Sequence, residues 1–282
     1  MRIAMGVEYD GSPYHGWQRQ GHDTNTVQQK LDDALSKVAD SKISVVCAGR
    51  TDSGVHGVGQ VVHFDTDVNR SEKAWVFGSN TNMPADITVH WAVPVVDDFH
   101  ARFSALSRRY RYVIYNSAVK PGLANKYVTW DYRPLDVERM QQAANHLIGA
   151  FDFSSFRAAG CQAKTATREI QSIHLFRKGA LVVMDIQANA FLQNMVRNVA
   201  GVLMAIGSGN KPIEWALEVL EAKDRTKGGN TAHPYGLYFM KVEYPEQFNI
   251  PYTTPEIPFM PLSDTIYFPQ KLNQRVLEQQ KS

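Results

Sequence analysis

One stretch of the chain, CAGRTDSGVHGVGQVVHFD at residues 47–65, places an arginine and a carboxylate two residues apart on a glycine-rich loop. These residues are Arg50 and Asp52, and a predicted strand follows them. Loops held by rigid strands often carry catalytic groups, and glycine lets a ligand approach the backbone closely. Asp52 is therefore a candidate catalytic carboxylate, able to stabilise positive charge, accept a proton or attack as a nucleophile. The alternative is ordinary turn chemistry, in which an Asp-Ser-Gly side chain bonds its own backbone.

A second segment, RRYRYVIYN at residues 108–116, alternates basic, aromatic and aliphatic side chains. On a strand, Tyr110 and Tyr112 share one face, while Arg109 and Arg111 share the other. Aromatic rings interleaved with arginine on a sheet are typical of surfaces that stack unpaired RNA bases. The alternative is an amphipathic strand with a solvated basic face.

Arg102 lies just ahead of this strand, in FHARFSALSRR, and completes the densest positive cluster of the chain. Four of ten consecutive residues are arginines: Arg102, Arg108, Arg109 and Arg111. If the protein binds nucleic acid, these side chains are expected to contact phosphates and to make binding depend on salt.

A third segment, NAFLQNMVRNVAGVLMAIG at residues 189–207, reads as an apolar helix with Arg197 inside it. The guanidinium either reaches solvent from the edge of the helix or is buried beside a carboxylate. The local sequence does not name that carboxylate.

The composition indicates a soluble cytoplasmic protein. The 282 residues are 44% hydrophobic and carry a net charge of only +2, so a basic surface must come from local clustering. Two cysteines, Cys47 and Cys161, fit a reducing compartment better than a disulfide framework. The N-terminus does not resemble a signal peptide, and no apolar run approaches the roughly 20 residues of a membrane span.

Several chemistries are disfavoured by the motifs. The phosphate-cradle patterns, the zinc-deaminase signature and the Gly-x-Ser-x-Gly elbow are not found in the sequence. His56 and His63 lie across a predicted strand, which makes a metal site improbable. We therefore expect no metal site.

Hydrophobic periodicity predicts two successive βαββαβ units, and hence an α+β fold of two ferredoxin-like halves. In the first half, strands and helices are predicted at residues 2–9, 27–38, 43–48, 60–64, 71–79 and 87–95. The second half repeats this order with one extra helix, at residues 109–115, 136–148, 170–176, 181–187, 191–206, 213–220 and 237–243. The predicted divisions are residues 1–100, residues 101–248, and a Pro-rich strap with a polar tail at 249–282.

Several segments, in order from about residue 3 to residue 245, resemble TruA-type tRNA pseudouridine synthases. AGRTDSGVHGVGQVVHF resembles the signature loop of that family, and EYDGSPYHGWQRQ resembles its N-terminal strand and loop. The linker and tyrosine strand correspond to FHARFSALSRRYRYVIYN, and later motifs correspond to FDFSSF, NAFLQNMVRNVAG and HPYGLYF.

This resemblance implies that the two halves share a large, mostly antiparallel sheet with a central cleft. It implies a homodimer that grips tRNA with both protomers and converts uridine to pseudouridine at positions 38, 39 and 40 of the anticodon stem-loop, without cofactor or metal. Asp52 matches the essential aspartate of the family. Arg197 is the family-matched candidate to pair with Asp52, because an arginine within about 4–6 Å lowers a carboxylate pKa by roughly 1–3 units.

The implied reaction breaks the bond between ribose C1′ and uracil N1, turns the base, and joins C5 to C1′. Asp52 could stabilise charge at C1′, add to it covalently, or remove a proton from C2′, and these routes stay open. The target uridine must be flipped out of its stack. We expect Arg50 to fill the vacated space or hold a phosphate, and Tyr110 to stack on the uracil or relay the proton from C5.

Two other functions fit parts of the sequence. A non-catalytic RNA-binding module would leave Asp52 as a turn residue. A nucleosidase would hydrolyse the same glycosidic bond and release the free base.

Overall fold

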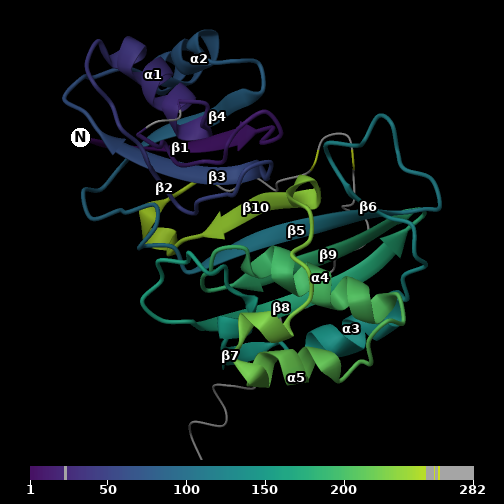
Figure 1. The fold of residues 1–282 in the computed structure, drawn as a ribbon. Helices are drawn as coiled ribbons and strands as arrows, with labels where there is room; N and C mark the ends of the chain where they lie inside the picture. Colours follow the sequence, from purple (N-terminus) through teal and green to yellow (C-terminus); the bar gives the residue numbers. More distant parts are fainter. Residues whose placement is uncertain (22–23, 252–256, 258–259, 261–282) are drawn as a thin grey trace, which may run out of the picture.

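The computed structural model (Figure 1) describes residues 1–21, 24–251, 257 and 260. The predicted strap and tail at 249–282 lie almost wholly outside these residues. Within the described part, a ten-stranded sheet runs through the molecule in the order β4-β1-β3-β10-β5-β9-β8-β7, with β2 and β6 paired beside it.

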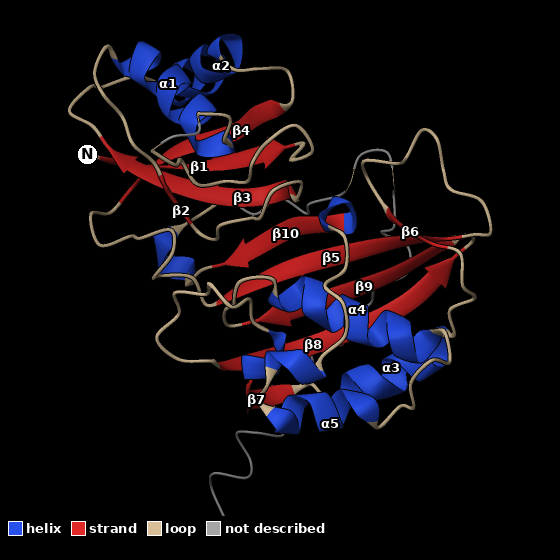
Figure 2. Cartoon of the chain, viewed as in Figure 1, coloured by secondary structure: helices blue, strands red, loops and turns tan. Residues whose placement is uncertain are grey.

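The N-terminal part of the sheet carries two helices (Figure 2). Its elements are β1 (Arg2–Tyr9), α1 (Val27–Ala39), β2 (Val46–Cys47), β3 (His56–Asp65), α2 (Glu72–Asn82) and β4 (Ile87–Val95). Thr26 and Ser71 begin the two helices as expected, because their side chains accept the backbone N–H of Gln29 and Ala74. The strand order β4-β1-β3, with β2 on the other side of β3, is that of a ferredoxin-like unit.

The C-terminal part repeats this arrangement with additional elements. It contains β5 (Ser107–Asn116), β6 (Thr129–Asp131), α3 (Val137–Asn145), β7 (Gly149–Asp152), β8 (Thr167–Lys178), β9 (Leu181–Ala188), α4 (Met195–Gly207), α5 (Trp215–Ala222) and β10 (Leu237–Glu243). Short 3₁₀ turns lie at Ser154–Phe156, Arg225–Lys227, Pro234–Gly236 and Glu246–Phe248. The order β10-β5-β9-β8 matches the order of the first unit, and β7 extends its edge.

Strand β10 joins the two units into one sheet. It pairs antiparallel with β5 and parallel with β3, where Tyr238 lies opposite His56 and Phe239 opposite Gly57. Gly59 permits the close approach of β3 and β10, because a Cβ at this position would lie 2.1 Å from the carbonyl oxygen of Met240. Among the described residues, the other strand pairs are antiparallel except β5 with β6, so the predicted α+β class with a mostly antiparallel sheet is confirmed.

Three hydrophobic clusters hold the described residues together, and two of them contain helices. One lies within residues 3–92 and packs α1 and α2 on β1, β3 and β4. The other packs α3, α4 and α5 on the C-terminal strands, and it also includes Ala48, Val55 and Val61 from the first unit. The helices therefore bury the apolar residues whose periodicity predicts them. The shared cluster places the loop before β3 against the second unit.

Several predicted bounds differ from the observed ones: β3 begins at His56 and not at residue 60, and β6 and β7 were not predicted. Two of the differences have a local cause. The strand expected at 43–48 is reduced to Val46–Cys47, because the backbone N–H groups of Ile43 and Val45 donate to Ser36 and Asp32 of α1 and not to a strand. The helix expected from residue 191 begins only at Met195, because Asn194 adopts a left-handed conformation with φ 62°.

Candidate active site

The loop that carries Asp52 connects β2 to β3 and is held by hydrogen bonds from neighbouring segments. The carbonyl of Thr51 accepts the backbone N–H of Trp17 at 3.0 Å, and its hydroxyl bonds the hydroxyl of Tyr9 at 2.9 Å. The side-chain amide of Gln60 donates to the carbonyl of Gly49 at 2.6 Å. The loop is therefore fixed from both sides, which keeps the Asp52 carboxylate in one place.

Glycine is required where the N-terminal segment crosses this loop. A Cβ on Gly11 would lie 1.9 Å from the carbonyl oxygen of Val55, and Gly16 adopts φ +93° beside Thr51. Gly54, at φ +78°, turns the chain directly after Ser53. The glycines in EYDGSPYHGW and TDSGV are thus required by close backbone approach or by positive φ, which their spacing in the sequence does not show.

Asp52 meets Arg197 across the two units. The Nη1 atom of Arg197 lies 3.4 Å from Oδ2 of Asp52, although the residues are 145 positions apart. Arg197 also donates from Nε to the carbonyl of Ala232 at 2.8 Å and from Nη1 to the side-chain oxygen of Asn194 at 3.1 Å. The expected contact between Arg197 and Asp52 is thus present, and two further acceptors orient the guanidinium.

Burial and charge act in opposite directions on Asp52. Loss of hydration raises the pKa of this carboxyl above its usual range, while the charge and hydrogen bond of Arg197 lower it. Burial is the larger effect, so the net shift of the pKa is upward. The side chains of Asp52 and Arg197 are 29% and 16% exposed, and both remain reachable from the cavity that they line.

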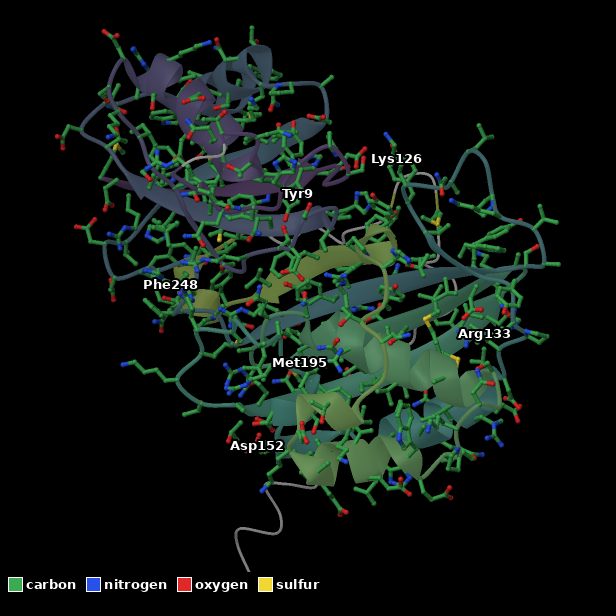
Figure 3. The ribbon with its side chains drawn as sticks, in the orientation of Figure 1. Tyr9, Lys126, Arg133, Asp152, Met195 and Phe248 are labelled. Atoms are coloured by element: carbon green, nitrogen blue, oxygen red, sulfur yellow. The ribbon has the colours of Figure 1, made fainter. Side chains whose placement is uncertain are left out.

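A cavity of about 1220 Å³ opens at this ion pair. It is lined from both units by residues that include Asp52, Arg197, Tyr110, Arg50, Arg102 and Arg108. Figure 3 labels Tyr9 in the first unit and Met195 at the start of α4, on either side of the region where β3 and β10 meet. A cavity of this size exceeds the space of one nucleoside and suits a larger polar ligand.

Tyr110 contributes little exposed surface to the cavity. It is 7% exposed, and its ring packs at steep angles against Phe191 and Phe239, with centroids 5.0 and 4.8 Å away. Burial raises the pKa of its hydroxyl well above the usual value, with smaller contributions from Tyr9 and Asp52. The phenol is therefore neutral, and it is held rigidly close to the Asp52 loop.

Arg108 also lines the cavity, but its guanidinium is occupied by backbone carbonyls. It donates to Asn189 at 2.8 Å and to Ala48 and Ala105 at 3.2 Å, and it also bonds the carbonyl of Arg102. These bonds tie β5 to the Asp52 loop and to the linker. Burial lowers the pKa of this guanidinium.

Arg109 and Arg111 are not brought to the cavity. Both pair with Asp185 on β9, which is fully buried, and Arg111 reaches its carboxylate at 2.9 Å. Strand alternation places them on the face opposite Tyr110, where Asp185 compensates their charge. Asp185 was missed by the sequence analysis, although a carboxylate inside the apolar strand LVVMDIQA is a signal of a buried partner.

Arg50 and Arg102 line the cavity as exposed side chains. Arg102 lies over the ring of Phe103 at 5.5 Å. Within residues 1–21, 24–251, 257 and 260, neither guanidinium has an ion-pair or hydrogen-bond partner. Both are therefore available to an anionic ligand.

No cluster of three or more His, Cys, Asp or Glu side chains in the described part of the chain could hold a metal ion. No helix in that part is long and apolar enough to cross a membrane. The ionisable groups that line the cavity are the Asp52 carboxylate, several guanidinium groups, the Tyr110 phenol, the His15 imidazole and the thiols of Cys47 and Cys161.

Known proteins are similar in sequence to this chain. A family model described as tRNA pseudouridine synthase matches residues 5–104 and 143–245. The tRNA pseudouridine synthase A of Alcanivorax borkumensis is 56% identical over 250 residues, which cover 89% of this chain and 94% of that protein. The tRNA pseudouridine synthase A of Pseudomonas aeruginosa is 58% identical over 250 residues, covering 89% of this chain and 88% of that protein.

Solved structures are more distant. A complex of Cbf5, Nop10 and Gar1 aligns with 84% of this chain and 48% of that chain, at 11% identity and a TM-score of 0.40.

Proposed function

The chain belongs to the tRNA pseudouridine synthase A family, and we propose that it isomerises uridine at positions 38, 39 and 40 of the anticodon stem-loop, with Asp52 acting at ribose C1′. This family membership shows that the chain is an isomerase that converts uridine to pseudouridine in tRNA. The observation that carries the finer proposal is the contact between Asp52 and Arg197 at the cavity between the two units.

Asp52 is proposed as the catalytic carboxylate because the reaction develops positive charge on the ribose. Breaking the C1′–N1 bond gives an oxocarbenium-like sugar, which a carboxylate at C1′ can stabilise or trap covalently. The carboxylate can instead take a proton from C2′ and give a glycal-like intermediate. All three routes need an ionised, fixed carboxylate, and the anchored loop around Thr51 supplies the fixed position.

Arg197 is proposed to keep Asp52 ionised while substrate excludes water. Burial already raises the pKa of Asp52, and a bound nucleoside would remove still more solvent. The guanidinium opposes this effect from 3.4 Å, and the carbonyl of Ala232 keeps it oriented. Because Arg197 comes from the other unit, the site is complete only when both units are folded together.

The target uridine is proposed to enter the cavity as a flipped-out nucleotide. Unstacking requires a few kcal/mol, which contacts made in the cavity must offset. Arg50, which is exposed at the cavity, is proposed to fill the space that the flipped base leaves or to bind a phosphate. Arg102 is assigned to a phosphate. Tyr110 is assigned to the uracil, and since 7% of it is exposed, an edge or hydroxyl contact is favoured over broad stacking.

The proposed partners are tRNA and a second copy of this chain, and the proposed compartment is the cytoplasm. A homodimer would give a mass near twice the 31.7 kDa of one chain in light scattering. A monomer at the concentrations that support activity would contradict the dimer without affecting the assignment of Asp52.

One assay separates the candidate reactions. Transfer RNA with tritium at uracil C5 is incubated with the protein, and tritium in water, free base and abasic sites are measured. Isomerisation releases tritium while the base stays attached, hydrolysis leaves an abasic site, and a binding module does neither. Transcripts carrying cytidine at positions 38, 39 and 40 should release no tritium, and release from them would contradict the proposed positions.

A further inference from the structure

Arg168 on β8 lines the same cavity from the wall formed by the second unit. Its Nη1 atom donates to the carbonyls of Thr165 and Thr167, at 3.2 and 2.6 Å. Its Nε atom is buried and has no hydrogen-bond partner within the part of the chain that the structure describes. Among the described residues, Arg168 makes no ion pair with a carboxylate.

The other arginines of the cavity differ from Arg168 in their partners or in their exposure. Arg197 is paired with Asp52, and the guanidinium of Arg108 donates its hydrogen bonds to backbone carbonyl groups. Arg168 is less exposed than Arg50 and Arg102, yet no carboxylate of the described residues compensates its charge. A partly buried guanidinium without a carboxylate is unfavourable unless an anion arrives from outside, and burial accordingly lowers the pKa of Arg168.

We propose that Arg168 is a phosphate-binding residue, which holds the RNA backbone beside the flipped uridine from the side of the cavity opposite the Asp52 loop. This rests on the proposed function, because RNA supplies the phosphate. The two carbonyl contacts hold Nη1 in place and leave Nη2 for the ligand. Arginine suits this task because its planar fork binds phosphate oxygens directionally.

The test is the salt dependence of tRNA affinity for the wild type, Arg168→Gln and Arg177→Gln. Arg177 lies on the same strand but does not line the cavity, and it too donates to a backbone carbonyl, that of Leu135 at 2.7 Å. We expect Arg168→Gln to reduce the slope of log K against log salt by about one and to weaken binding at least about tenfold at low salt. Arg177→Gln should leave both unchanged. An unchanged slope for Arg168→Gln overturns the proposal.

A second measurement uses the wild-type chain, so it does not depend on a variant folding. Phenylglyoxal modifies accessible guanidinium groups, and bound tRNA should protect Arg168 but not Arg177. Equal modification of Arg168 with and without tRNA overturns the phosphate site. Because both tests measure binding, a chain that binds tRNA through Arg168 yet releases no tritium would refute the proposed reaction alone.

A different observation concerns Asn194, which precedes α4. This residue adopts the left-handed conformation, at φ 62° and ψ 2°, and its side chain makes no capping bond to the helix. Its side-chain oxygen instead accepts Nη1 of Arg197 at 3.1 Å, the same atom that faces Asp52 at 3.4 Å. Strained backbone of this kind is concentrated at functional sites.

We infer that Asn194 is a positioning residue that aims the Arg197 guanidinium at Asp52, and this too rests on the proposed function. Arg197 on α4 is the charged neighbour that lowers the pKa of Asp52, and Asp52 in turn raises the pKa of Tyr110 on β5. Asn194→Gly keeps the left-handed backbone accessible and removes only the side chain. Asn194→Asp places a second carboxylate on Arg197, where it competes with Asp52.

The matched control is Asn249→Gly, because Asn249 has the same residue type at φ 48° and does not line the cavity. We expect Asn194→Gly to lower kcat with little change in KM and to move the acid limb of kcat to higher pH. The shift should be smaller than the roughly 1–3 units expected for loss of an arginine. Asn194→Asp should move the acid limb of kcat to still higher pH, and Asn249→Gly should leave it in place. A wild-type kcat and pH profile in Asn194→Gly overturns the inference.

Discussion

Replacing Arg197 with glutamine tests the electrostatic role of the ion pair directly. The substitution removes the positive charge that lies 3.4 Å from Asp52. At an effective dielectric constant of about 20, two unit charges at this distance interact by about 5 kcal/mol. Both side chains retain some contact with solvent, so the observed range for such pairs, about 1–3 pKa units or about 1.4–4 kcal/mol, is the better expectation.

The direction of the shift follows from the two effects on Asp52. Burial raises the pKa of this carboxyl and Arg197 opposes it, so removal of Arg197 leaves burial unopposed. The ionised carboxylate is the proposed active form. Activity is therefore present above the pKa of Asp52 and is lost as the pH falls through it. In Arg197→Gln this loss should begin at a pH about 1–3 units higher than in the wild type.

The measurement is the single-turnover rate of tritium release at saturating tRNA, followed from acid to alkaline pH. Arg50→Gln is the control, since Arg50 lines the same cavity but is not among the charges that shift the pKa of Asp52. It should weaken binding and leave the acid limb in place. An acid limb in Arg197→Gln that coincides with that of the wild type would refute the electrostatic role.

Four further outcomes are expected. Arg197→Lys keeps the charge but lacks the fork that serves Asp52 and Ala232 together, so the rate should fall at every pH with a smaller shift of the acid limb; a wild-type rate would contradict this. Asp52→Asn should abolish tritium release while tRNA affinity stays within a few-fold. The pKa of Asp52 is higher in the folded protein than in the unfolded chain, so ionisation of this carboxyl destabilises the fold at neutral pH. Asp52→Asn should therefore melt no lower than the wild type at neutral pH. A lower melting temperature would contradict the upward direction of the pKa shift. Tyr110→Phe should keep most activity, whereas Tyr110→Ala should lose about 3–5 kcal/mol of stability in urea unfolding; equal loss of activity in both would show that the hydroxyl is essential. Gly11→Ala should lower kcat by displacing the Val55 carbonyl, whereas Gly21→Ala, which meets open space, should not.

Much of the fold was predictable because its elements follow local rules. The caps at Thr26 and Ser71 form as their sequence patterns indicate. The bounds of β1 and β4 coincide with the predicted ranges, because alternation of apolar residues marks a strand that buries one face. The resemblance to a known family supplied the pairing of Asp52 with Arg197, which spacing alone does not indicate.

Other features depended on partners that are distant in the chain. The strand predicted at 43–48 was wrong in length because Asp32 and Ser36 take its backbone N–H groups. The cluster of arginines before and within β5 is divided by the tertiary structure, since Asp185 on β9 neutralises two of them and carbonyl groups occupy Arg108. Local sequence shows that these side chains are charged, but it does not show what lies opposite them.

By itself, the sequence determined the two βαββαβ units and the glycine-rich loop that carries Asp52, because periodicity, caps and turns are properties of neighbouring residues. Only the tertiary structure decided which charges meet. The parallel pairing of β10 with β3, permitted by Gly59, brings the second unit against the loop and sets the Arg197 guanidinium 3.4 Å from the carboxylate. That contact depends on the distance between side chains 145 residues apart, which packing of the two units determines and local spacing does not.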